Sequence, residues 1–530
     1  MATQEPKKRV AIIGAVVGIL VTCNAGVGGL VSLKECLAEG LEADVFEARP
    51  EIGGQWAYQA VPESAEGIQL QSSMYDGVVT NTCRDTTSFS DFPLDPARYP
   101  DFFGHAHMLQ YINEYADHFK LRKHVHLRTK VIGCVPTEGA KWIVKLQGEG
   151  GELEERTYDA LFAATGARVI PNIPEFKGRE SFKGEFIHSQ QYRSPGRFEG
   201  KRVVLIGLGS SAADLSCELA PACKEVHIIT RRGGWILPRY ILGKPAEAWD
   251  NRATQVWVPT SISEPIQTLL LNTVQGQHPK ALKPDHTVLA QNPTVRSDLI
   301  ERVRTGTIRV HRATVECFTE SGLTLSDGTT LEADVVIACT GYQNSLPYLP
   351  PDVLYESSST PSNTVDLWRL LVPIRYPNLF VVGFVELTGP SPPTIEAQAR
   401  LAAAVLSGHA KLPPPAQLEH EVREWQAWQA RRFVRSARHA TTDFYIPYVD
   451  RILEPLGANP TLGRLLVQVF SSGAPWKALK TLNAVYFGIA SSAQWRLCGY
   501  GSNQELARET VLRIAEGKEK LSDEEVKYVS

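Results

Sequence analysis

The sequence predicts an α/β protein with two Rossmann-like dinucleotide-binding domains, an inserted irregular subdomain and a helical C-terminal region. The first observation is a strand pattern at 10–14, a glycine-rich turn, a helical pattern at 30–39 and a second strand at 43–46. The second observation is that the same order returns at 202–206, 207–212, 214–219 and 225–230. Because a strand, a glycine turn, a helix and a parallel strand form the unit that binds dinucleotides, two such units are expected in tandem.

Composition places the 530 residues among globular proteins and argues against one class of partner. Hydrophobic residues make up 43% of the chain and charged residues 21%, which excludes a chain disordered throughout. The 55 Lys and Arg against 58 Asp and Glu give a net charge of −3, so no nucleic-acid partner is expected. The nine cysteines contain no CxxC pair, which is typical of free thiols in a reducing compartment, and no metal site is expected.

The same patterns divide the chain into four segments. Residues 1–167 form the first part of the first nucleotide-binding domain, 168–334 the second domain with an insertion at about 235–304, 335–445 the return to the first domain, and 446–530 a helical region with a charged tail. The insertion has no regular period and contains seven prolines between Pro238 and Pro293. It therefore predicts loops more than regular elements.

The second glycine turn fits the pattern GxGxxA through Gly207, Gly209 and Ala212. These small residues allow a tight turn, close approach of the backbone to a pyrophosphate, and close packing of helix on strand. Arg231 and Arg232 follow the next strand, where an NAD-binding protein would carry an acid. Guanidinium groups there suit a 2′-phosphate and favour NADP over NAD, unless they are simply two solvated arginines.

The first turn is interrupted. Glu47 ends the second strand as a ribose-binding acid would, but Gly14 and Ala15 are followed by valines, and the expected continuation of the fingerprint appears only at Gly26. Without 16–25 the sequence reads VAIIGAGVGGL and the GxGxxG pattern is complete. Two interpretations remain: these residues come from a mis-drawn gene model, such as a short retained intron, or they form a genuine bulge that either spares or destroys the phosphate contacts.

The interruption also lengthens an uncharged stretch. The 24 residues between Arg9 and Lys34 carry no charge and follow a basic cluster, a pattern also typical of a signal anchor or a membrane helix. Several glycines interrupt the stretch, and a buried parallel strand followed by a turn and a helix has the same hydropathy. The strand, turn and helix are the favoured interpretation.

Separated blocks of the chain resemble the animal-type flavin-containing monooxygenases, the N,N-dimethylaniline monooxygenase family. The most specific block is FKGEFIHSQQY at 182–192, which fits FxGxxxHxxxY through Phe182, Gly184, His188 and Tyr192. Related Baeyer–Villiger enzymes carry Trp where Tyr192 stands, which favours heteroatom oxidation. Further matches are EIGGQW at 51–56, TNT at 80–82, FSDFP at 89–93, CTGY at 339–342, EAQAR at 396–400 and YFGIASSAQWRLCGYG at 486–501.

The resemblance implies an enzyme that uses FAD, NADPH and O₂. NADPH would reduce FAD, whose C4a-hydroperoxide then passes oxygen to an amine nitrogen or a sulfide sulfur of a small, xenobiotic-like substrate. The implied FAD contacts are Gly14, Ala15, Gly26, Gly28, Gly29, Glu47, Gln55, Trp56, Thr80, Asn81, Thr82 and Val131, and the implied NADPH contacts are Gly207, Gly209, Ser210, Ser211, Ala212, Asp214, Arg231 and Arg232.

The resemblance also assigns roles to two single residues. Asn81 matches an Asn that hydrogen-bonds beside the flavin and is the expected catalytic residue, although from the residues alone it would be a turn residue. His188 is expected to be structural or to orient NADP, because its block lies in the linker between the two nucleotide units.

The chain departs from the family at its end. Vertebrate members end in an apolar membrane anchor, whereas this chain ends in EEVKYVS, so no C-terminal anchor is expected. The expected location is the cytoplasm or the cytosolic face of the endoplasmic reticulum. Any peripheral membrane contact would come from the insertion, with Trp249, Trp257 and Leu269–Leu271 as candidates, unless these residues belong to the core or line the substrate route. Homo-oligomerisation stays open.

Other functions remain as alternatives. The same cofactors could serve Baeyer–Villiger or uncoupled NADPH oxidase activity. A catalytically silent flavoprotein would result if the interruption at 16–25 disrupted the FAD turn. A flavin-dependent disulfide reductase is disfavoured because no CxxxxC pair follows the first turn.

Overall fold

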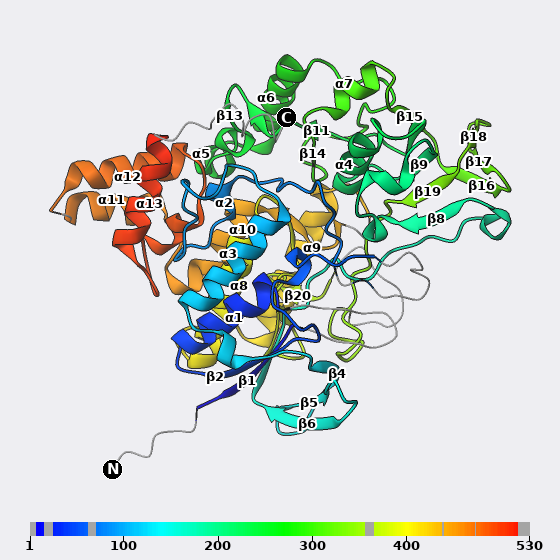
Figure 1. Cartoon of the computed structure of the whole chain (residues 1–530). Coiled ribbons are helices and arrows are strands. Elements are labelled where there is room, and N and C mark those ends of the chain that lie inside the picture. The colour runs from blue at the N-terminus through cyan, green and yellow to red at the C-terminus, as the bar shows by residue number, and fades with distance from the viewer. Residues whose placement is uncertain are drawn as a thin grey trace, which may run out of the picture.

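Two five-stranded parallel sheets form the frame of the protein (Figure 1). The computed structural model describes residues 7–14, 25–61, 70, 72–355, 365–436, 439–471 and 473–517. The first sheet has the order β22-β7-β1-β2-β3 and the second the order β15-β10-β9-β19-β8. Both sheets are therefore built as the repeated strand, turn and helix pattern predicts.

The first sheet is assembled from three distant parts of the chain. Its strands are β1 (Arg9–Ile13), β2 (Glu42–Phe46), β3 (Val125–His126), β7 (Ala160–Ala163) and β22 (Leu379–Val381). Residues 10–13 of β1 are fully buried because the strand lies between β2 and β7 and is covered on both faces. α1 (Val27–Ala38) follows β1 and packs against α8 (Ser391–Ser407), whose run of small residues allows close approach.

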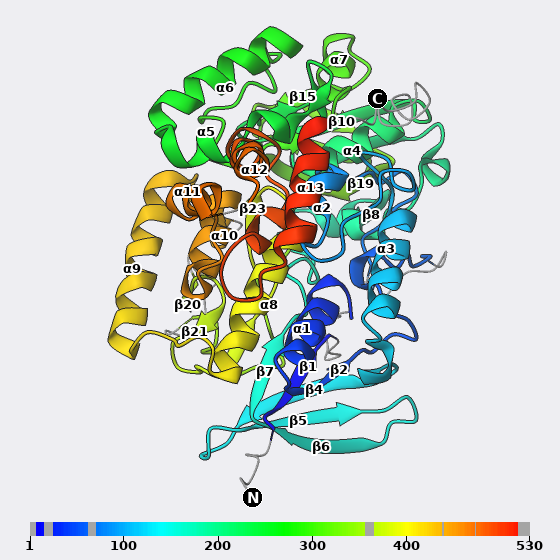
Figure 2. The same cartoon turned by 90° about the vertical axis from the view of Figure 1, so that its left-hand side faces the viewer.

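A three-stranded antiparallel sheet extends below the first sheet (Figure 2). It consists of β4 (Lys130–Pro136), β5 (Trp142–Gln147) and β6 (Leu153–Tyr158). Trp142, Val144 and Leu146 alternate along β5 and are buried in the core of the first sheet. The helices α2 (Arg84–Thr87) and α3 (His105–His118) precede this sheet in the sequence.

The second sheet has a different cover on each face. Its strands are β8 (Glu185–His188), β9 (Arg202–Ile206), β10 (Glu225–Thr230), β15 (Arg309–Arg312) and β19 (Val335–Ala338). One face packs against α4 (Ser210–Leu219) and α7 (Leu299–Arg304), and the other against β16 (Val315–Thr319), β17 (Gly322–Leu325) and β18 (Thr330–Glu332). β19 belongs to this sheet and ends at Ala338, four residues past the expected boundary at 334, and the division of the chain into domains stays a prediction.

The insertion contains more regular structure than its prolines suggest. Short strands at β11 (Ile236–Leu237), β12 (Tyr240–Ile241), β13 (Lys244–Pro245) and β14 (Thr294–Val295) surround α5 (Arg252–Trp257) and α6 (Thr260–Gln275). Pro265 lies inside α6 and does not end it. Of the apolar residues named from the sequence, Trp249, Trp257 and Leu269 are exposed, whereas Leu271 is buried.

Helices dominate the C-terminal region, as expected (Figure 1). They are α9 (Pro415–Arg432), α10 (Tyr445–Leu453), α11 (Leu462–Ser471), α12 (Pro475–Phe487) and α13 (Gln504–Glu516). The remaining short strands are β20 (Leu367–Trp368), β21 (Val372–Pro373), β23 (Glu386–Thr388) and β24 (Thr442–Phe444). Among the described residues, no helix combines the length and the apolar character that crossing a membrane requires.

A buried ion network ties this C-terminal region to the first sheet. The Nη2 of Arg496 lies 2.9 Å from Glu35 Oε1 on α1, 2.8 Å from Glu396 Oε1 on α8 and 3.4 Å from Asp91 Oδ2. Lys34 pairs with both Glu35 and Asp91. Burial by itself would raise the pKa of Glu35, but Arg496 and Lys34 outweigh it and lower that pKa to about 2.

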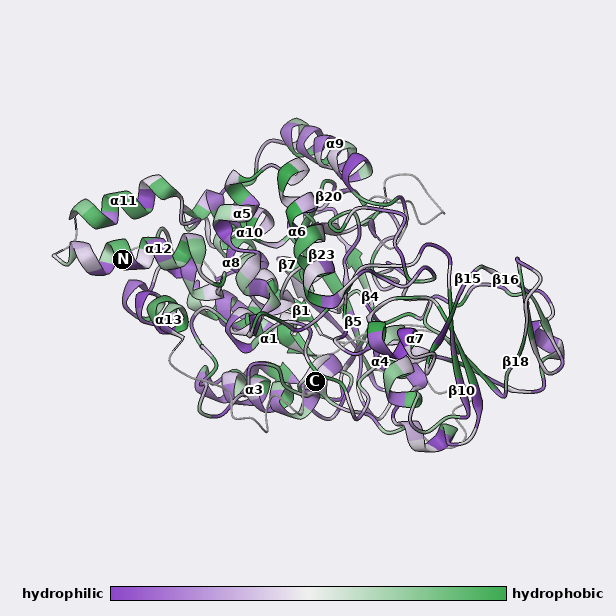
Figure 3. Cartoon of the chain, turned by 90° about the horizontal axis from the view of Figure 1, so that it is seen from above, coloured by the Kyte–Doolittle hydropathy of each residue, from purple (hydrophilic) through white to green (hydrophobic). Residues whose placement is uncertain are grey.

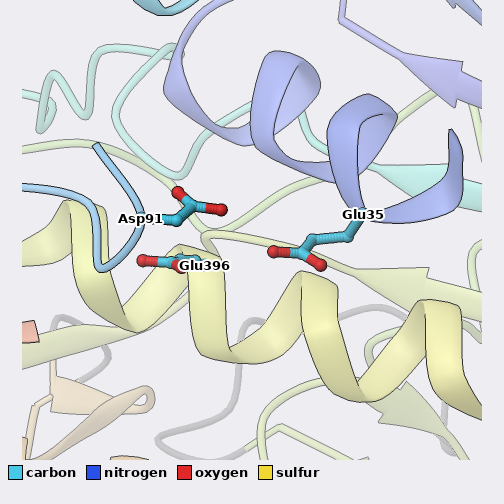
Figure 4. Close-up of side chains that lie close together, drawn as sticks. All are labelled: Glu35, Asp91 and Glu396. Carbon is cyan, nitrogen blue, oxygen red and sulfur yellow. The ribbon is translucent and has the colours of Figure 1, made fainter. Parts of the chain in front are cut away.

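Figure 4 shows the three carboxylates of the network facing one another. Glu35, Asp91 and Glu396 lie close enough together to hold a metal ion. Lys34 and Arg496 already pair with them, however, and the buried Arg400 adds a third positive charge beside the cluster. Arg496 also donates from Nε to Ser90 Oγ at 2.7 Å. We therefore assign the cluster a structural role.

Replacing Arg496 should destabilise the whole chain. Arg496→Met leaves the carboxylates of Glu35, Asp91 and Glu396 without the one cation that contacts all three, which we expect to lower the free energy of unfolding by about 3–5 kcal/mol. Urea denaturation measures the change. The control is Arg423→Met, which removes an exposed ion pair with Glu419 on α9 and should cost under about 0.5 kcal/mol. Equal effects of the two substitutions would contradict the role of the network.

Candidate functional site

The first glycine turn is closed across the interruption. A Cβ on Gly14 would lie 2.9 Å from Phe46 O and 3.0 Å from Ala25 N, so the residues on either side of 15–24 are neighbours in space. Gly14 N donates to Phe46 O at 3.0 Å, and Gly53 N donates to Ala25 O at 3.0 Å. Ala25 therefore lies next to Gly14, in the position that Ala15 has in the predicted turn. Ala15 itself lies outside the described residues.

The glycines after the interruption have the geometry that a dinucleotide needs. Gly26 precedes α1, and no side chain of the described residues caps the helix, so none of these side chains occupies the N–H groups that could bind a phosphate. A Cβ on Gly28 would lie 3.4 Å from Ala164 Cβ, and one on Gly29 would lie 3.6 Å from Val45 Cγ1. The absence of side chains therefore lets α1 pack closely on β2 and on the segment after β7.

Glu47 stands at the end of β2, as predicted, and is completely buried. One carboxylate oxygen accepts the Ala25 N–H, and the other accepts the Arg49 N–H at 2.7 Å. Burial raises the pKa of Glu47 to about 8 despite these donors. In this structure the carboxyl group joins Ala25 of the first turn to the end of β2 and to Arg49, and its contact with a ribose stays a prediction.

The other residues assigned to FAD lie in a short helix, in the segment 80–82 and on β4. Gln55 and Trp56 belong to a short helix at Gly54–Trp56, and Gln55 Oε1 accepts Ser73 N at 3.0 Å. Thr80 Oγ1 accepts Phe103 N at 3.2 Å, while Thr82 Oγ1 lies 2.9 Å from Thr87 Oγ1. The side chain of Val131 is buried in the core on β4, so only its backbone could face a cofactor.

The second turn is uninterrupted. Gly207 has φ +115°, and a Cβ there would lie 2.5 Å from Cys339 O, so no other residue fits. Gly209 precedes α4 without a side-chain cap, which leaves the N–H groups of the first turn, including those of Ser210 and Ser211, free for a phosphate. Ala212 is completely buried where the helix meets the sheet.

Asp214 faces the first domain from the second turn of α4. Its carboxylate accepts the Tyr75 hydroxyl at 2.7 Å and lies 3.4 Å from Arg296 Nη1 in the insertion. Burial raises the pKa of Asp214, although Arg239 and Arg296 oppose the shift. These contacts dock the second unit onto residues 72–78, and a contact of Asp214 with NADPH stays a prediction.

Arg239 is the site residue that sequence reasoning missed. Its guanidinium is buried in the insertion and donates to Thr80 O at 3.1 Å, Val79 O at 3.2 Å and Asn81 Oδ1 at 3.4 Å. Because Oδ1 of the exposed Asn81 is engaged, the amide N–H₂ is the end left to face a ligand. Nothing in the aperiodic sequence around Arg239 signals this contact, which joins residues 158 positions apart.

His188 has both ring nitrogens engaged. Nε2 lies 3.1 Å from Gly341 O, and Nδ1 accepts the Gln190 N–H at 3.2 Å. Burial lowers the pKa of His188 to about 4, so the ring is neutral at pH 7. In the same block, a Cβ on Gly184 would lie 2.7 Å from Asp334 O, which explains the need for glycine there. The block joins β8 to the CTGY segment.

A model of the flavin-binding monooxygenase-like family matches residues 7–526. This chain belongs to that family. It is 34% identical over 511 residues to flavin-containing monooxygenase 5 of Cavia porcellus, covering 93% of this chain and 90% of that protein.

Two solved structures have similar folds. The S-allyl-L-cysteine S-oxygenase of Allium sativum has a TM-score of 0.62 and 23% identity, covering 85% of this chain and 88% of that one. Cyclohexanone monooxygenase from Rhodococcus sp. Phi1, bound to NADP⁺, has a TM-score of 0.60 and 17% identity, covering 85% and 97%.

Family membership confirms several predictions made from the sequence. The chain is an enzyme, a flavoprotein monooxygenase with two Rossmann-like domains, and its cofactors are FAD and NADPH. The uncapped helix N-termini and the glycine cradles of both turns fit these cofactors. A small-molecule substrate and O₂ are the partners that a monooxygenase requires.

Joining Gly14 directly to Ala25 should restore an uninterrupted FAD turn. We expect a chain without residues 15–24 to retain at least as much FAD as the full chain, because both ends already lie side by side. The visible absorbance of bound flavin after gel filtration measures this. In the shortened chain, Gly14→Val should lose FAD, since its Cβ would meet Phe46 O at 2.9 Å. A shortened chain with less FAD would mean that the segment is a genuine part of the site.

Proposed function

We propose that this flavoprotein monooxygenase oxygenates soft nucleophiles, the nitrogen of an amine or the sulfur of a sulfide, in small xenobiotic-like molecules. The observation that carries the proposal is the setting of Asn81. Asn81 lies in the segment 80–82, which we call the FAD-side loop, and its neutral amide is exposed there. Arg239 of the insertion orients this amide. The amide of Asn81 can therefore donate a hydrogen bond at the reaction centre, and it is neither an acid nor a base.

The residues of this chain bind the two cofactors, orient them and exclude water from the site. The free N–H groups at the starts of α1 and α4 attract the phosphates of the two cofactors. When bound, the flavin supplies the electron transfer and the activation of O₂. An unprotonated amine or a sulfide is already nucleophilic, so it needs no general base, and the neutral amide of Asn81 fits that requirement.

Tyr192 supports heteroatom oxidation over Baeyer–Villiger oxidation. Its hydroxyl donates to Glu218 Oε2 at 2.9 Å on α4, and its ring packs edge-on against Tyr75 at 5.7 Å between centroids. The resemblance associates Trp at this position with Baeyer–Villiger oxidation. The hydroxyl of Tyr192 therefore forms a hydrogen bond to Glu218 at the seam between the two nucleotide units, where the Baeyer–Villiger relatives carry the larger ring of Trp.

Product analysis with a tertiary amine, a thioether and a ketone tests the proposal. We expect N-oxide and sulfoxide with one NADPH consumed per product, and little ester from the ketone. Asn81→Leu should lower product formation by about 100-fold while NADPH consumption continues, because one preorganised donor is lost.

The control is Asn113→Leu, on the outer part of α3, which should match the wild type. Ester as the main product would support the Baeyer–Villiger alternative, and hydrogen peroxide without organic product would support an oxidase. Protein that stays colourless after incubation with FAD would contradict both enzymatic readings and indicate a silent scaffold.

We further propose that α11 and α12 bind a lipid surface. These two helices expose Leu462, Leu466, Val467, Phe470, Trp476, Leu479 and Phe487, which we call the α11–α12 surface. Figure 3 shows α11 and α12 at the edge of the molecule, with stretches of hydrophobic colour along α11. Phe470 is 85% and Trp476 78% exposed, which is unusual for large apolar side chains. Trp257 of the insertion borders this surface by stacking on Tyr486 at 4.5 Å.

Charge supports a membrane as the occupant of this surface. Residues 455–504 contain no Asp or Glu, whereas Arg464, Lys477 and Lys480 are exposed there. Apolar side chains among cations suit a bilayer that contains anionic lipids. Peripheral association with the cytosolic face of the endoplasmic reticulum is the location that this surface supports.

Sedimentation with vesicles tests the lipid surface. We expect the protein to bind phosphatidylcholine vesicles containing phosphatidylserine, and to bind less at high salt. Phe470→Ser with Trp476→Ser should reduce the bound fraction by about tenfold. Leu153→Ser, which changes a residue 71% exposed on β6, should leave it unchanged. A homo-oligomer that the double substitution dissociates, without vesicle binding, would assign the surface to a second copy of the chain.

A further inference from the structure

Cations gather at the carboxyl end of β10. Arg231 and Arg232 directly follow that strand and are exposed. Lys283 of the insertion and Arg312 of β15 are exposed as well. Within the part of the chain that the structure describes, the side chains of Arg231, Arg232 and Lys283 form no hydrogen bond or ion pair. Such unpaired cations form a site of positive potential with room for an anion.

The insertion reaches this site through its backbone. A Cβ on Gly233, which has φ +67°, would lie 2.6 Å from Lys283 O, so the two segments cross in direct contact. Gly234 N donates to Leu282 O at 3.0 Å, and Asp285 N donates to Arg232 O at 3.3 Å. The backbone of Lys283 is therefore held beside the turn that carries the two arginines.

Arg312 clamps the two segments together. It pairs in register with Thr230, the last residue of β10. Its Nη1 donates to Lys283 O at 2.8 Å and its Nη2 to Arg232 O at 3.5 Å. The carboxylate of Asp285 lies 4.0 Å from the same guanidinium and is the acid that opposes the cations here.

We propose that Lys283 and Arg312 complete the subsite for the 2′-phosphate of NADPH, with Lys283 as a binding residue and Arg312 as a positioning residue. The end of the second strand is where the adenosine ribose lies in a dinucleotide-binding unit. A phosphate dianion is held best by several cations, and the Arg231–Arg232 turn supplies only part of them. This inference deepens the function proposed above and gives the insertion a part in coenzyme selection.

Binding of 2′,5′-ADP and 5′-AMP to the whole protein tests the proposal without activity, because the two ligands differ only in the 2′-phosphate. Isothermal titration measures both. We expect Lys283→Gln to weaken 2′,5′-ADP about tenfold and to leave 5′-AMP unchanged. Asp285→Asn should strengthen 2′,5′-ADP about threefold, because it removes a repulsive charge. The control is Arg309→Gln, three residues before Arg312 on β15, which only loses a contact with Glu225.

The positioning role of Arg312 has a separate readout. Arg312→Gln should raise the KM for NADPH about tenfold with kcat and the KM for NADH unchanged, and Arg312→Lys should recover part of the loss. Unchanged discrimination between 2′,5′-ADP and 5′-AMP in Lys283→Gln and Asp285→Asn would overturn the subsite. If the protein lacks oxygenase activity but the titrations follow the expected pattern, the proposed function fails and the subsite stands.

Discussion

The rest of the structure depends on the ion pairs that the buried guanidinium of Arg496 forms. It joins Glu35 on α1 to Glu396 on α8 and to Asp91, and so connects the C-terminal region to the helix whose N-terminus is predicted to bind a cofactor phosphate. A buried cation is tolerated only while carboxylates surround it, so the four segments must come together. The C-terminal helices are therefore part of the flavin domain.

Contacts between the two nucleotide units form a second constraint. Asp214 accepts the Tyr75 hydroxyl across the seam, and Arg239 reaches from the insertion to Asn81. One part of the insertion thus orients the FAD-side loop. Another part lies beside the coenzyme in the subsite proposed above. Its lack of a regular period reflects this position, because it follows the surfaces of two domains instead of packing one apolar face.

Local patterns predicted the frame of the fold well. The strands at 202–206 and 225–230 have the predicted bounds because apolar runs end in glycine or in charge. Prediction failed where local signals mislead, because the prolines of the insertion predicted loops, whereas Pro265 lies inside α6. The place of β19 follows from its pairing with β8 and β9, which a local pattern does not show. The exposure of Phe470 and Trp476 was also missed, since an amphipathic helix pattern does not show whether its apolar face has a partner.

The sequence by itself predicted the family and its coenzyme pair from motifs spread along the chain, and it predicted the second phosphate turn because that turn consists of residues close together. Gly207 illustrates this, since its φ of +115° is a local property that glycine permits. Only the tertiary structure decided that Gly14 lies against Ala25, that Arg239 holds Asn81 and that Lys283 lies beside Arg232. Such contacts join residues 11 to 158 positions apart, and they follow from the packing of whole domains, which leaves no periodic trace in the sequence.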